Sequence, residues 1–591
     1  MARVRSGDGV SLTRKMRSAR VLLDCGLAEA VLVGALFLVP LATAPWLVDP
    51  YVYAKWHLLA ALAAGWLLVE RFACDSRGLP ASVRRVWPAW AALAVSVVVG
   101  SLRNGVGWAV QPLTARATFV ALALASFWYF RRTQLGLDSL RAATRAAVAA
   151  VVTLGLLQFA GLDLLSWLPG GDHRSAAFGN VNMAAESVGL ALVALLAVSP
   201  DARGSARRWT TGIATEAVAA AALAYLWLAG SRSVGLALPA ATGVLLLARR
   251  LTLRRLLRSI AAAAFLAFVV PNALGRAEPL ISSAPESKRA SASWRLAVWS
   301  DTLGLIRDHP EGVGAGNFEH AFIPYALAGR SKPGEFIFFR SPHNDYLRLV
   351  AEEGIAAALL LLGLLAALGR GLHRSPAVAG WRSGPGALLA SCGAFLLVEA
   401  FFQFPFEMAY PSLLAAVLLG LALACAEGPI VPEAASLAAP PHAGIRRAGD
   451  AVAVFLALAI VAGVVRTAAA ERLFTVSRGA DVVALEQACR LDPRRLEACV
   501  QAAWLRSRAG EHEAARGELY AVLGRSPWYF PAIKLLGEDL LAAGEPAAGC
   551  RHLRRYDAMF EGRSAAHERV RAFCAPGPAE RPAANVTGSG R

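Results

Sequence analysis

The sequence is short of charge. Asp, Glu, Lys and Arg make up only 17% of its 591 residues, whereas 56% are hydrophobic and stand in long blocks. This distribution is typical of a membrane protein and excludes a wholly soluble chain, in which apolar residues recur singly at helix or strand spacing. A membrane-spanning helix needs about 20 mostly apolar residues, so the blocks predict an all-α fold, a polytopic bundle of about 12 to 13 transmembrane helices. The candidate spans lie near 27–48, 53–72, 86–103, 112–130, 146–163, 183–199, 209–229, 233–249, 257–272, 345–369, 386–406, 410–426 and 451–468.

Cysteine is also scarce, and its spacing gives no indication of a zinc site. None of the eight cysteines forms a CxxC pair or a cysteine and histidine pattern that binds zinc. Four lie in or beside predicted spans, and there we expect cysteine to serve as a small apolar residue. The other four lie in the C-terminal tail: Cys489, Cys499, Cys550 and Cys574. In an oxidising compartment they could form two disulfides in any of three connectivities, although helical repeats also bury free cysteines.

Acidic residues are fewer than basic ones, which gives a net charge of +18. If this charge were clustered on one soluble face, it would suggest a nucleic-acid partner. Here the basic residues are concentrated in alternate loops between the predicted spans. With a cytoplasmic N-terminus, alternate loops carry most of the Lys and Arg residues. The intervening short loops carry only Lys55, Arg103, Arg116, Arg174 and Arg232. This asymmetry fixes the orientation of the bundle in the membrane, so the charge requires no nucleic-acid partner.

One long polar segment, 273–344, interrupts the spans. On the predicted topology it is a large loop on the outer face, within a transmembrane domain that covers 1–426. Its SASWRLAVWSDTLGLIRDHP predicts a short interfacial helix, because Trp294 and Trp299 suit the headgroup region. GVGAGNF then predicts a tight glycine turn. Long loops with their own patterning usually carry function.

The C-terminal part has a different organisation. Residues 427–449, rich in Pro and Ala, predict a cytoplasmic linker to a final span at 450–470. Pro493 and Pro527, like Gly510 and Gly544, are separated by 34 residues. That period resembles tetratricopeptide repeats, so we expect a repeat domain at 471–575 that binds a protein partner, and a disordered tail at 576–591. An odd number of spans puts this domain on the outer side, whereas twelve spans would put it in the cytoplasm.

Polar residues at the outer ends of spans form the candidate site. Arg232, in GSRS, stands in an outward turn where insertion favours no cation, although arginines at helix ends also snorkel without further function. Arg174, Asn180 and Asn182 precede another outward-facing helix start, where Asn182 is equally well explained as a helix N-cap. Helix N-termini offer positive partial charge and free amide donors, so together with arginines they suit an anion. At the outer leaflet this suggests the diphosphate of a lipid.

The string RSPHNDYLRLVAEEG, residues 340–354, closes the outer loop. We expect Ser341 and Pro342 to start a helix that continues into the next span. His343 would then share one helix face with Leu347 and would end a stripe that packs into the bundle. A lone histidine in a loop is more often solvated or structurally hydrogen-bonded. Glu352 and Glu353 lie about two turns deeper, where we expect one carboxylate to be buried in the bundle and paired.

These motifs together resemble the O-antigen ligase and O-antigen polymerase superfamily of bacterial membrane proteins. The resemblance covers roughly residues 20 to 426 and follows four motifs in order. The matching residues are Gly179, Asn180 and Asn182; Ser231 and Arg232; Arg295, His309, Pro310, Gly312, Gly314, Gly316 and Asn317; and His343, Asn344, Tyr346, Leu347, Glu352 and Gly354. Val181 stands where the family commonly has proline, and the last span and the repeats lie outside the common core.

The resemblance implies an inverting glycosyltransferase that needs neither metal nor other cofactor. It would act at the outer face of the bacterial cytoplasmic membrane, on an undecaprenyl-diphosphate-linked glycan. Arg232 and Arg295 would hold the diphosphate, with Arg174 as a further candidate, and His343 would orient or deprotonate the acceptor hydroxyl. The remaining residues would bind substrate or position loops: Ser231, Asn180, Asn182, Asn344 and Tyr346.

The acceptor stays open between lipid A-core, a growing polysaccharide and a protein. Outside this class of enzyme, a polyprenyl-glycan or anion transporter would also expose polar residues, but its site would be expected near the midplane on broken helices. A scaffold would need far fewer spans.

Overall fold

The computed structural model describes residues 26–74, 81–85, 87–102, 105–134, 136–172, 174–198, 206–272, 285–326, 339–378, 382–427, 443–477, 479–559 and 567–574. Within these ranges the chain is helical and contains no strand, which confirms the predicted fold class. The predicted disordered tail and most of the predicted linker lie outside the described residues.

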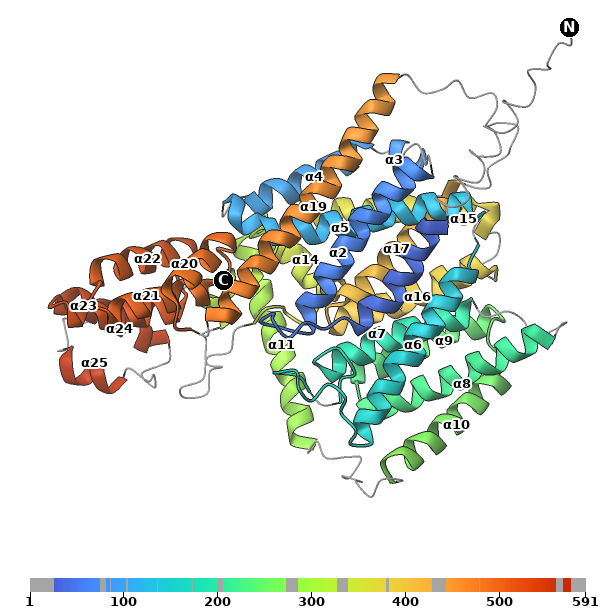
Figure 1. Cartoon of the computed structure of the whole chain (residues 1–591), viewed down its shortest axis with the longest axis horizontal. Helices are drawn as coiled ribbons and strands as arrows, with labels where there is room; N and C mark the ends of the chain where they lie inside the picture. Colours follow the sequence, from blue (N-terminus) through green and yellow to red (C-terminus); the bar gives the residue numbers. More distant parts are fainter. Residues whose placement is uncertain are drawn as a thin grey trace, which may run out of the picture.

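A bundle of apolar helices makes up most of the molecule (Figure 1). Its helices are α2 (Val52–Leu68), α4 (Trp87–Leu102), α5 (Val106–Arg132), α6 (Asp138–Phe159), α7 (Val181–Ala197), α8 (Ala206–Ala229), α9 (Arg232–Leu247), α10 (Leu253–Asn272), α15 (Ile355–Arg374), α16 (Gly384–Phe402), α17 (Ala409–Glu427) and α19 (Ala443–Ser477). Eight helices among the described residues are long and apolar enough to cross a membrane.

Those eight correspond to eight of the predicted spans. Four more predictions correspond to shorter apolar helices, Gly26–Leu41, Pro88–Leu102, Val181–Ala197 and Arg232–Leu247. The remaining one, 257–272, is part of α10, which belongs to neither group and carries three arginines in its first two turns. The apolar blocks therefore predicted where helices form better than how long they are.

The predicted span at 345–369 is wrong in one respect, because it consists of two helices. Helix α14 (Asp345–Glu353) ends where Gly354 takes φ 87°, and α15 begins at Ile355. Only glycine adopts this backbone without strain. The break lets Ile355 N–H bond to the carbonyl of Pro310, at a distance of 2.9 Å, so the outer loop is attached at the corner between the two helices.

Three further helices complete the outer loop, and six make the C-terminal part. The loop contains α11 (Pro285–Asp308), α12 (Phe318–Ala321) and α13 (Ile323–Ala326). The C-terminal helices are α20 (Val482–Leu491), α21 (Leu496–Arg508), α22 (His512–Arg525), α23 (Phe530–Ala542), α24 (Pro546–Met559) and α25 (His567–Phe573). In Figure 1 these last helices, in red and orange, lie beside one another at the end of α19. Cys489 pairs with Cys499 and Cys550 with Cys574, one of the three predicted connectivities.

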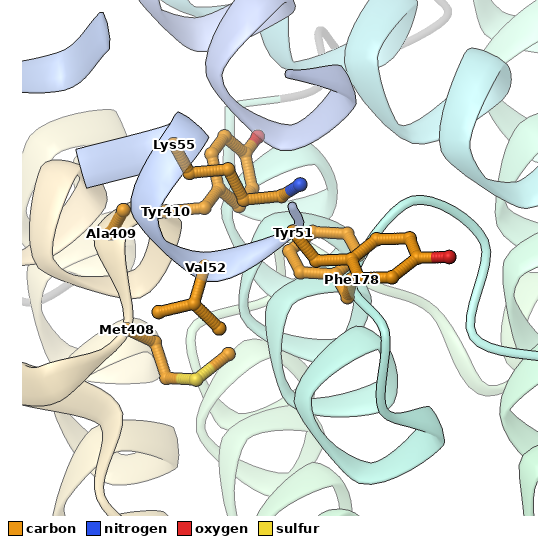
Figure 2. Close-up of a pocket in the computed structure, with 7 residues that line it drawn as sticks. All are labelled: Tyr51, Val52, Lys55, Phe178, Met408, Ala409 and Tyr410. Atoms are coloured by element: carbon orange, nitrogen blue, oxygen red, sulfur yellow. The ribbon is translucent and has the colours of Figure 1, made fainter. Parts of the chain in front are cut away.

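A small pocket lies where α2, the turn before α7 and the start of α17 meet (Figure 2). It is lined by Tyr51, Val52, Lys55, Phe178, Met408, Ala409 and Tyr410. The buried Lys55 ammonium donates to the carbonyls of Ala42, at 2.7 Å, and Ala177. It also stands over the Phe178 ring. Lys55 therefore fastens the turn that carries Asn180 and Asn182 to the bundle.

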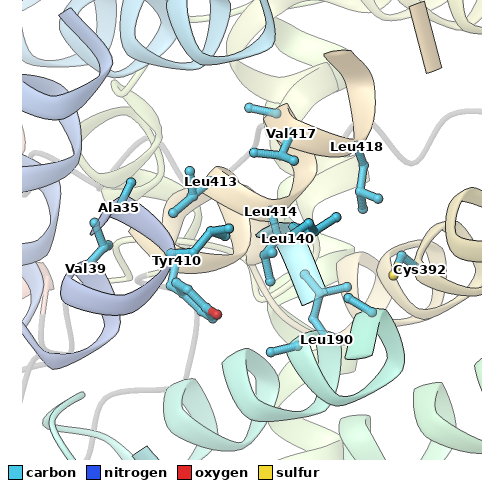
Figure 3. Close-up of a cluster of buried hydrophobic side chains, with 14 of the residues drawn as sticks. Ala35, Val39, Leu140, Leu190, Cys392, Tyr410, Leu413, Leu414, Val417 and Leu418 are labelled. Atoms are coloured by element: carbon cyan, nitrogen blue, oxygen red, sulfur yellow. The ribbon is translucent and has the colours of Figure 1, made fainter. Parts of the chain in front are cut away.

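The central helix of the core is α17, which is almost entirely buried. Leu413, Leu414 and Val417 of α17 belong to one apolar cluster with Leu140 of α6 and Leu190 of α7 (Figure 3). Around this core, α16 packs against α9 and α7. The N-terminus of α9 and the C-terminus of α16 consequently lie at the same end of the bundle, and there the candidate site is built.

Candidate active site

Helix α9 begins with two serines that flank an arginine. Ser231 is the N-cap residue, and the preceding Gly230 takes φ 64° to make the turn from α8. Ser231 and Ser233 are buried and their hydroxyls lie 3.3 Å apart, whereas Arg232 is exposed. The alternation turns the guanidinium of Arg232 away from the bundle, beside the free amides of a helix N-terminus.

Helix α11 brings Arg295 to the same place. Trp299, one turn further on, donates its indole N–H to the carbonyl of Pro342 at 2.9 Å. Its ring meets Phe401 at the end of α16, with ring centroids 5.2 Å apart. The tryptophan therefore fixes α11 against both the string before α14 and the last turn of α16. Arg295 is half-buried there, close enough to Arg232 for the two charges to repel each other.

His343 lies outside the helix that was predicted to contain it. The helix begins at Asp345, because the Asn344 side chain caps it by accepting the Leu347 N–H at 3.0 Å. His343 itself takes φ 52°, and its N–H donates to Ser341 Oγ at 3.2 Å. It is thus not part of the packing stripe of α14. A residue with positive φ outside glycine is uncommon and is found where surrounding contacts hold it.

The His343 ring faces the end of α16. Its Nδ1 lies 3.5 Å from Gln403 Oε1, and its ring centroid is 5.2 Å from that of Phe404. Burial, together with the positive charge of Arg295, lowers the pKa of His343 below its usual value. Burial and the charge of Arg232 likewise lower the pKa of Arg295, against an opposing effect of Glu399. The two arginines and the histidine thus form one electrostatically coupled group.

Sequence reasoning missed three residues that adjoin this group: Ser233, Glu399 and Gln403. Glu399 is completely buried near the end of α16 and accepts a 2.7 Å hydrogen bond from Ser233 Oγ. Gln403, the C-cap residue of α16, donates from Nε2 to the same hydroxyl at 3.4 Å. A lone carboxylate in an apolar run followed four residues later by glutamine, as in VEAFFQ, is a sequence pattern that could have found both.

The other predicted substrate-binding residues have local structural partners. Asn180, not Asn182, caps α7, and its side chain accepts the N–H of Asn182 at 2.9 Å. Both asparagines are exposed. Tyr346 donates its hydroxyl to the Leu397 carbonyl at 2.9 Å. Arg174 is exposed, with its guanidinium 5.8 Å from the Phe159 ring. None of the contacts described for Arg174 joins it to Arg232, Arg295 or His343.

Glu352 and Glu353, at the end of α14, are buried and paired with arginines. Arg348 donates to Glu352 at 3.0 Å, and Arg116 pairs with Glu353. Although burial raises the pKa of Glu352, the charges of Arg348 and Arg116 outweigh it and hold that pKa below the usual value. The pair of Arg116 and Glu353 fastens the end of α14 to α5, whereas Arg348 and Glu352 pair within α14, so both carboxylates serve the structure of this region.

The glycine turn closes over the same corner. The N–H groups of Val313 and Gly314 donate to the carbonyls of Ala351 and Glu352, at 2.9 and 2.8 Å. Gly312 takes φ 84°, and a Cβ there would stand 2.5 Å from the Glu352 carbonyl oxygen. The turn thus fits against the end of α14 only because position 312 has no side chain, and it holds the helix that begins next to His343.

Comparison with known proteins gives a match that includes residues of this site. No curated protein matches the chain. A family model described as O-antigen ligase matches residues 217–362, a segment that contains Arg232, Arg295 and His343. Residues 217–362, which supply Arg232, Arg295 and His343 to this site, are therefore similar to O-antigen ligases, and the apolar helices are those of a multi-pass helical membrane protein.

Proposed function

We propose that the chain transfers a glycan from an undecaprenyl-diphosphate-linked donor to an acceptor at the outer face of the bacterial cytoplasmic membrane. One observation carries this proposal. Arg232, Arg295 and His343 come from three separate elements that meet at the end of α16, where Arg232 acts electrostatically on Arg295 and Arg295 acts on His343. Two guanidiniums held together against their mutual repulsion suit a ligand with more than one negative charge.

In the proposed reaction the arginines bind the diphosphate. Arg232, at the N-terminus of α9, and Arg295 would neutralise the negative charge that develops as the bond from the sugar to the diphosphate breaks. Diphosphate is a good leaving group, so this charge stabilisation can take the place of a metal ion. Attack by the acceptor from the opposite face of the sugar would invert the anomeric centre.

His343 would be the general base. Its lowered pKa keeps the imidazole neutral at pH 7 and able to take a proton from the acceptor hydroxyl. Arg174, Asn180 and Asn182 would contact the sugars or the lipid headgroup from the neighbouring turn. Asn344 and Tyr346, which are fixed by bonds to Leu347 and Leu397, would position the string that carries His343.

The C-terminal helices would serve partner or acceptor binding on the outer side. The pairing Cys489–Cys499 and Cys550–Cys574 supports an oxidising compartment for them. A tetratricopeptide-like arrangement would suit a protein, either as partner or as the acceptor of a protein O-oligosaccharyltransferase. Lipid A-core and a growing polysaccharide are the other two acceptor classes to compare.

The test incubates the purified chain in nanodiscs with a lipid-linked glycan and each acceptor class, without ATP or metal. We expect transfer to one class by the native chain and a loss of at least about a hundredfold in Arg232→Ala and His343→Ala, since each removes a group that acts on the reacting atoms. Arg258→Ala, which removes an arginine paired with Glu216, is the matched control and should keep full activity. Full transfer by both site variants would refute the site, and transfer that requires ATP would indicate a transporter or another enzyme.

A further inference from the structure

A line of side chains connects His343 to a carboxylate inside the bundle. His343 Nδ1 lies 3.5 Å from Gln403 Oε1, Gln403 Nε2 lies 3.4 Å from Ser233 Oγ, and Ser233 Oγ lies 2.7 Å from Glu399 Oε1. The last three residues are buried, with exposed fractions of 6%, 3% and 0%. The line passes from the end of α16 to α9 and back, so it exists only because these helices pack together.

The donor and acceptor of each hydrogen bond in this line can be assigned. Ser233 has one hydroxyl proton, and an ionised carboxylate only accepts, so the short contact assigns that proton to Glu399. Ser233 Oγ must then accept from Gln403, which orients the amide nitrogen toward the serine and the amide oxygen toward the histidine. An amide oxygen only accepts as well. His343 must therefore carry its proton on Nδ1.

We propose that Glu399, acting through Ser233 and Gln403, holds neutral His343 in the tautomer protonated on Nδ1, so that Nε2 is the atom that takes the acceptor's proton. Glu399, Ser233 and Gln403 are positioning residues, because they act through His343 and touch no reacting atom. A second serine supports the arrangement, since the Ser231 hydroxyl lies 3.3 Å from Ser233 Oγ and can donate to its remaining lone pair.

The consequence for the reaction rests on the proposed function. As the acceptor oxygen forms its bond to the anomeric carbon, its O–H bond breaks and the proton moves to His343 Nε2. The bond from the anomeric carbon to the diphosphate breaks, and its electron pair leaves with the diphosphate at Arg232 and Arg295. The imidazolium that forms has its Nδ1–H already directed at Gln403, so no ring rotation is needed.

Other charged groups face this line from several elements. Arg295 of α11 acts on both His343 and Glu399, and Arg232 acts on Arg295. Glu186 of α7 interacts with Glu399 and with Asp345 of α14. Oε2 of Glu399 has no hydrogen-bond partner among the described residues, so Ser233 is the donor that the structure provides for this carboxylate. Replacing Glu399 therefore removes the acceptor that sets the direction of the line.

Glu399→Gln tests the direction of these hydrogen bonds, because it changes the volume of the side chain very little. A glutamine amide can donate to Ser233, after which Ser233 can donate to a flipped Gln403, whose nitrogen then faces His343. That reversal favours the proton on Nε2 and leaves the base unable to accept. Ser233→Ala is the second variant, because it cuts the line while Glu399 stays. Ser391→Ala, which removes a buried hydroxyl that bonds within α16 two turns away, is the control.

The experiment measures ¹⁵N chemical shifts of histidine in the full chain, labelled with ¹⁵N-histidine and held in nanodiscs, with His343 assigned by comparison with His343→Asn. The native chain and Ser391→Ala should show the Nδ1–H tautomer, and Glu399→Gln should shift His343 toward the Nε2–H form. Ser233→Ala should give a mixture. An Nε2–H form in the native chain, or an unchanged tautomer in Glu399→Gln, would overturn the proposal.

Glycan transfer gives a second readout. Glu399→Gln should lower kcat on the order of tenfold to a hundredfold while KM changes little, because only proton transfer is affected. A fall in transfer without a tautomer change would assign Glu399 another task and overturn the proposal. If native protein shows the Nδ1–H form and the variants shift it, but no preparation transfers glycan, the tautomer assignment stands and the proposed function fails.

Discussion

At the scale of single residues, His343 is the side chain on which the proposed chemistry depends. Its backbone is in the left-handed region, at φ 52°, and its ring is held between Gln403 and Phe404. The neighbouring Arg295 favours the neutral imidazole. A neutral base whose ring and backbone are already held by their neighbours requires little rearrangement before proton transfer.

The lowered pKa of His343 gives a prediction for pH. Because the neutral form is the proposed base, kcat/KM should rise with pH through the pKa of His343, which lies below its usual value, and should reach its plateau by pH 7. Burial raises the pKa of Asp345 to about 7, so this carboxyl group titrates within the same profile. Asp345→Asn identifies its contribution. A limb near pH 7 that persists in Asp345→Asn would contradict the assignment to His343.

His343→Asn should abolish transfer without unfolding the protein. Asparagine tolerates the left-handed region better than alanine does, so the turn before α14 should keep its shape while the base is lost. We expect a loss of about a hundredfold or more in kcat and an unchanged melting temperature. Transfer rates and thermal unfolding of the same preparation check both statements. Activity within threefold of the native protein would show that His343 is not the base.

At the scale of elements, the break between α14 and α15 positions the site. Gly354 takes φ 87°, and a Cβ there would stand 2.5 Å from the backbone of Glu311. Hydrogen bonds from the glycine turn to Ala351 and Glu352 hold the other side of the corner. Helix α14 therefore has a fixed direction, and so does the string that precedes it.

Gly354→Ala should destabilise the fold by about 1 to 3 kcal/mol, because alanine is strained at this φ and meets backbone that cannot move aside. Gly363, inside α15, has open space around the position of a Cβ. Gly363→Ala is the matched control and should be neutral or slightly stabilising. Thermal unfolding in detergent checks the pair. Equal melting temperatures would mean that the corner is not under this constraint.

Some of these features could be predicted from the sequence and others could not, for physical reasons. Long apolar runs predict where helices lie, since the bilayer requires them, but a glycine within such a run does not reveal that the chain turns there. Arg232, Arg295 and His343 were predicted from motifs that face one side of the membrane. Glu399 was missed because its place beside Ser233 depends on how α16 packs on α9, between positions 166 residues apart. The local pattern VEAFFQ can single out Glu399 and Gln403, but it does not show that they contact Ser233.

At the scale of the whole molecule, the C-terminal helices rest on the outer loop. Ile323 of the loop shares an apolar cluster with Ile533 of α23, and Trp108 at the start of α5 packs into a cluster with Leu496. Arg494 donates to the carbonyl of Gly316 in the glycine turn. The C-terminal helices and the loop before α14 thus lie on one side of the bundle, which agrees with the proposed role at a single membrane face.

The disulfides test on which side of the membrane the C-terminal helices lie. In protein alkylated during extraction from cells, we expect Cys489–Cys499 and Cys550–Cys574 as linked peptides, because disulfides persist outside the cytoplasm. The buried Cys392 and Cys425 should be recovered as thiols and serve as internal controls. Mass spectrometry of non-reduced digests provides the measurement. Recovery of all four C-terminal cysteines as alkylated thiols would place these helices in the cytoplasm.

The central claim is that one site removes a glycan from a lipid diphosphate and passes it to an acceptor. Single-turnover reactions of the purified chain, without ATP or metal, can follow both products by mass spectrometry. We predict that undecaprenyl diphosphate and the glycosylated acceptor appear together in equal amounts and that neither forms in Arg232→Ala. Release of undecaprenyl diphosphate without an acceptor product, or movement of intact donor across the membrane, would contradict the account.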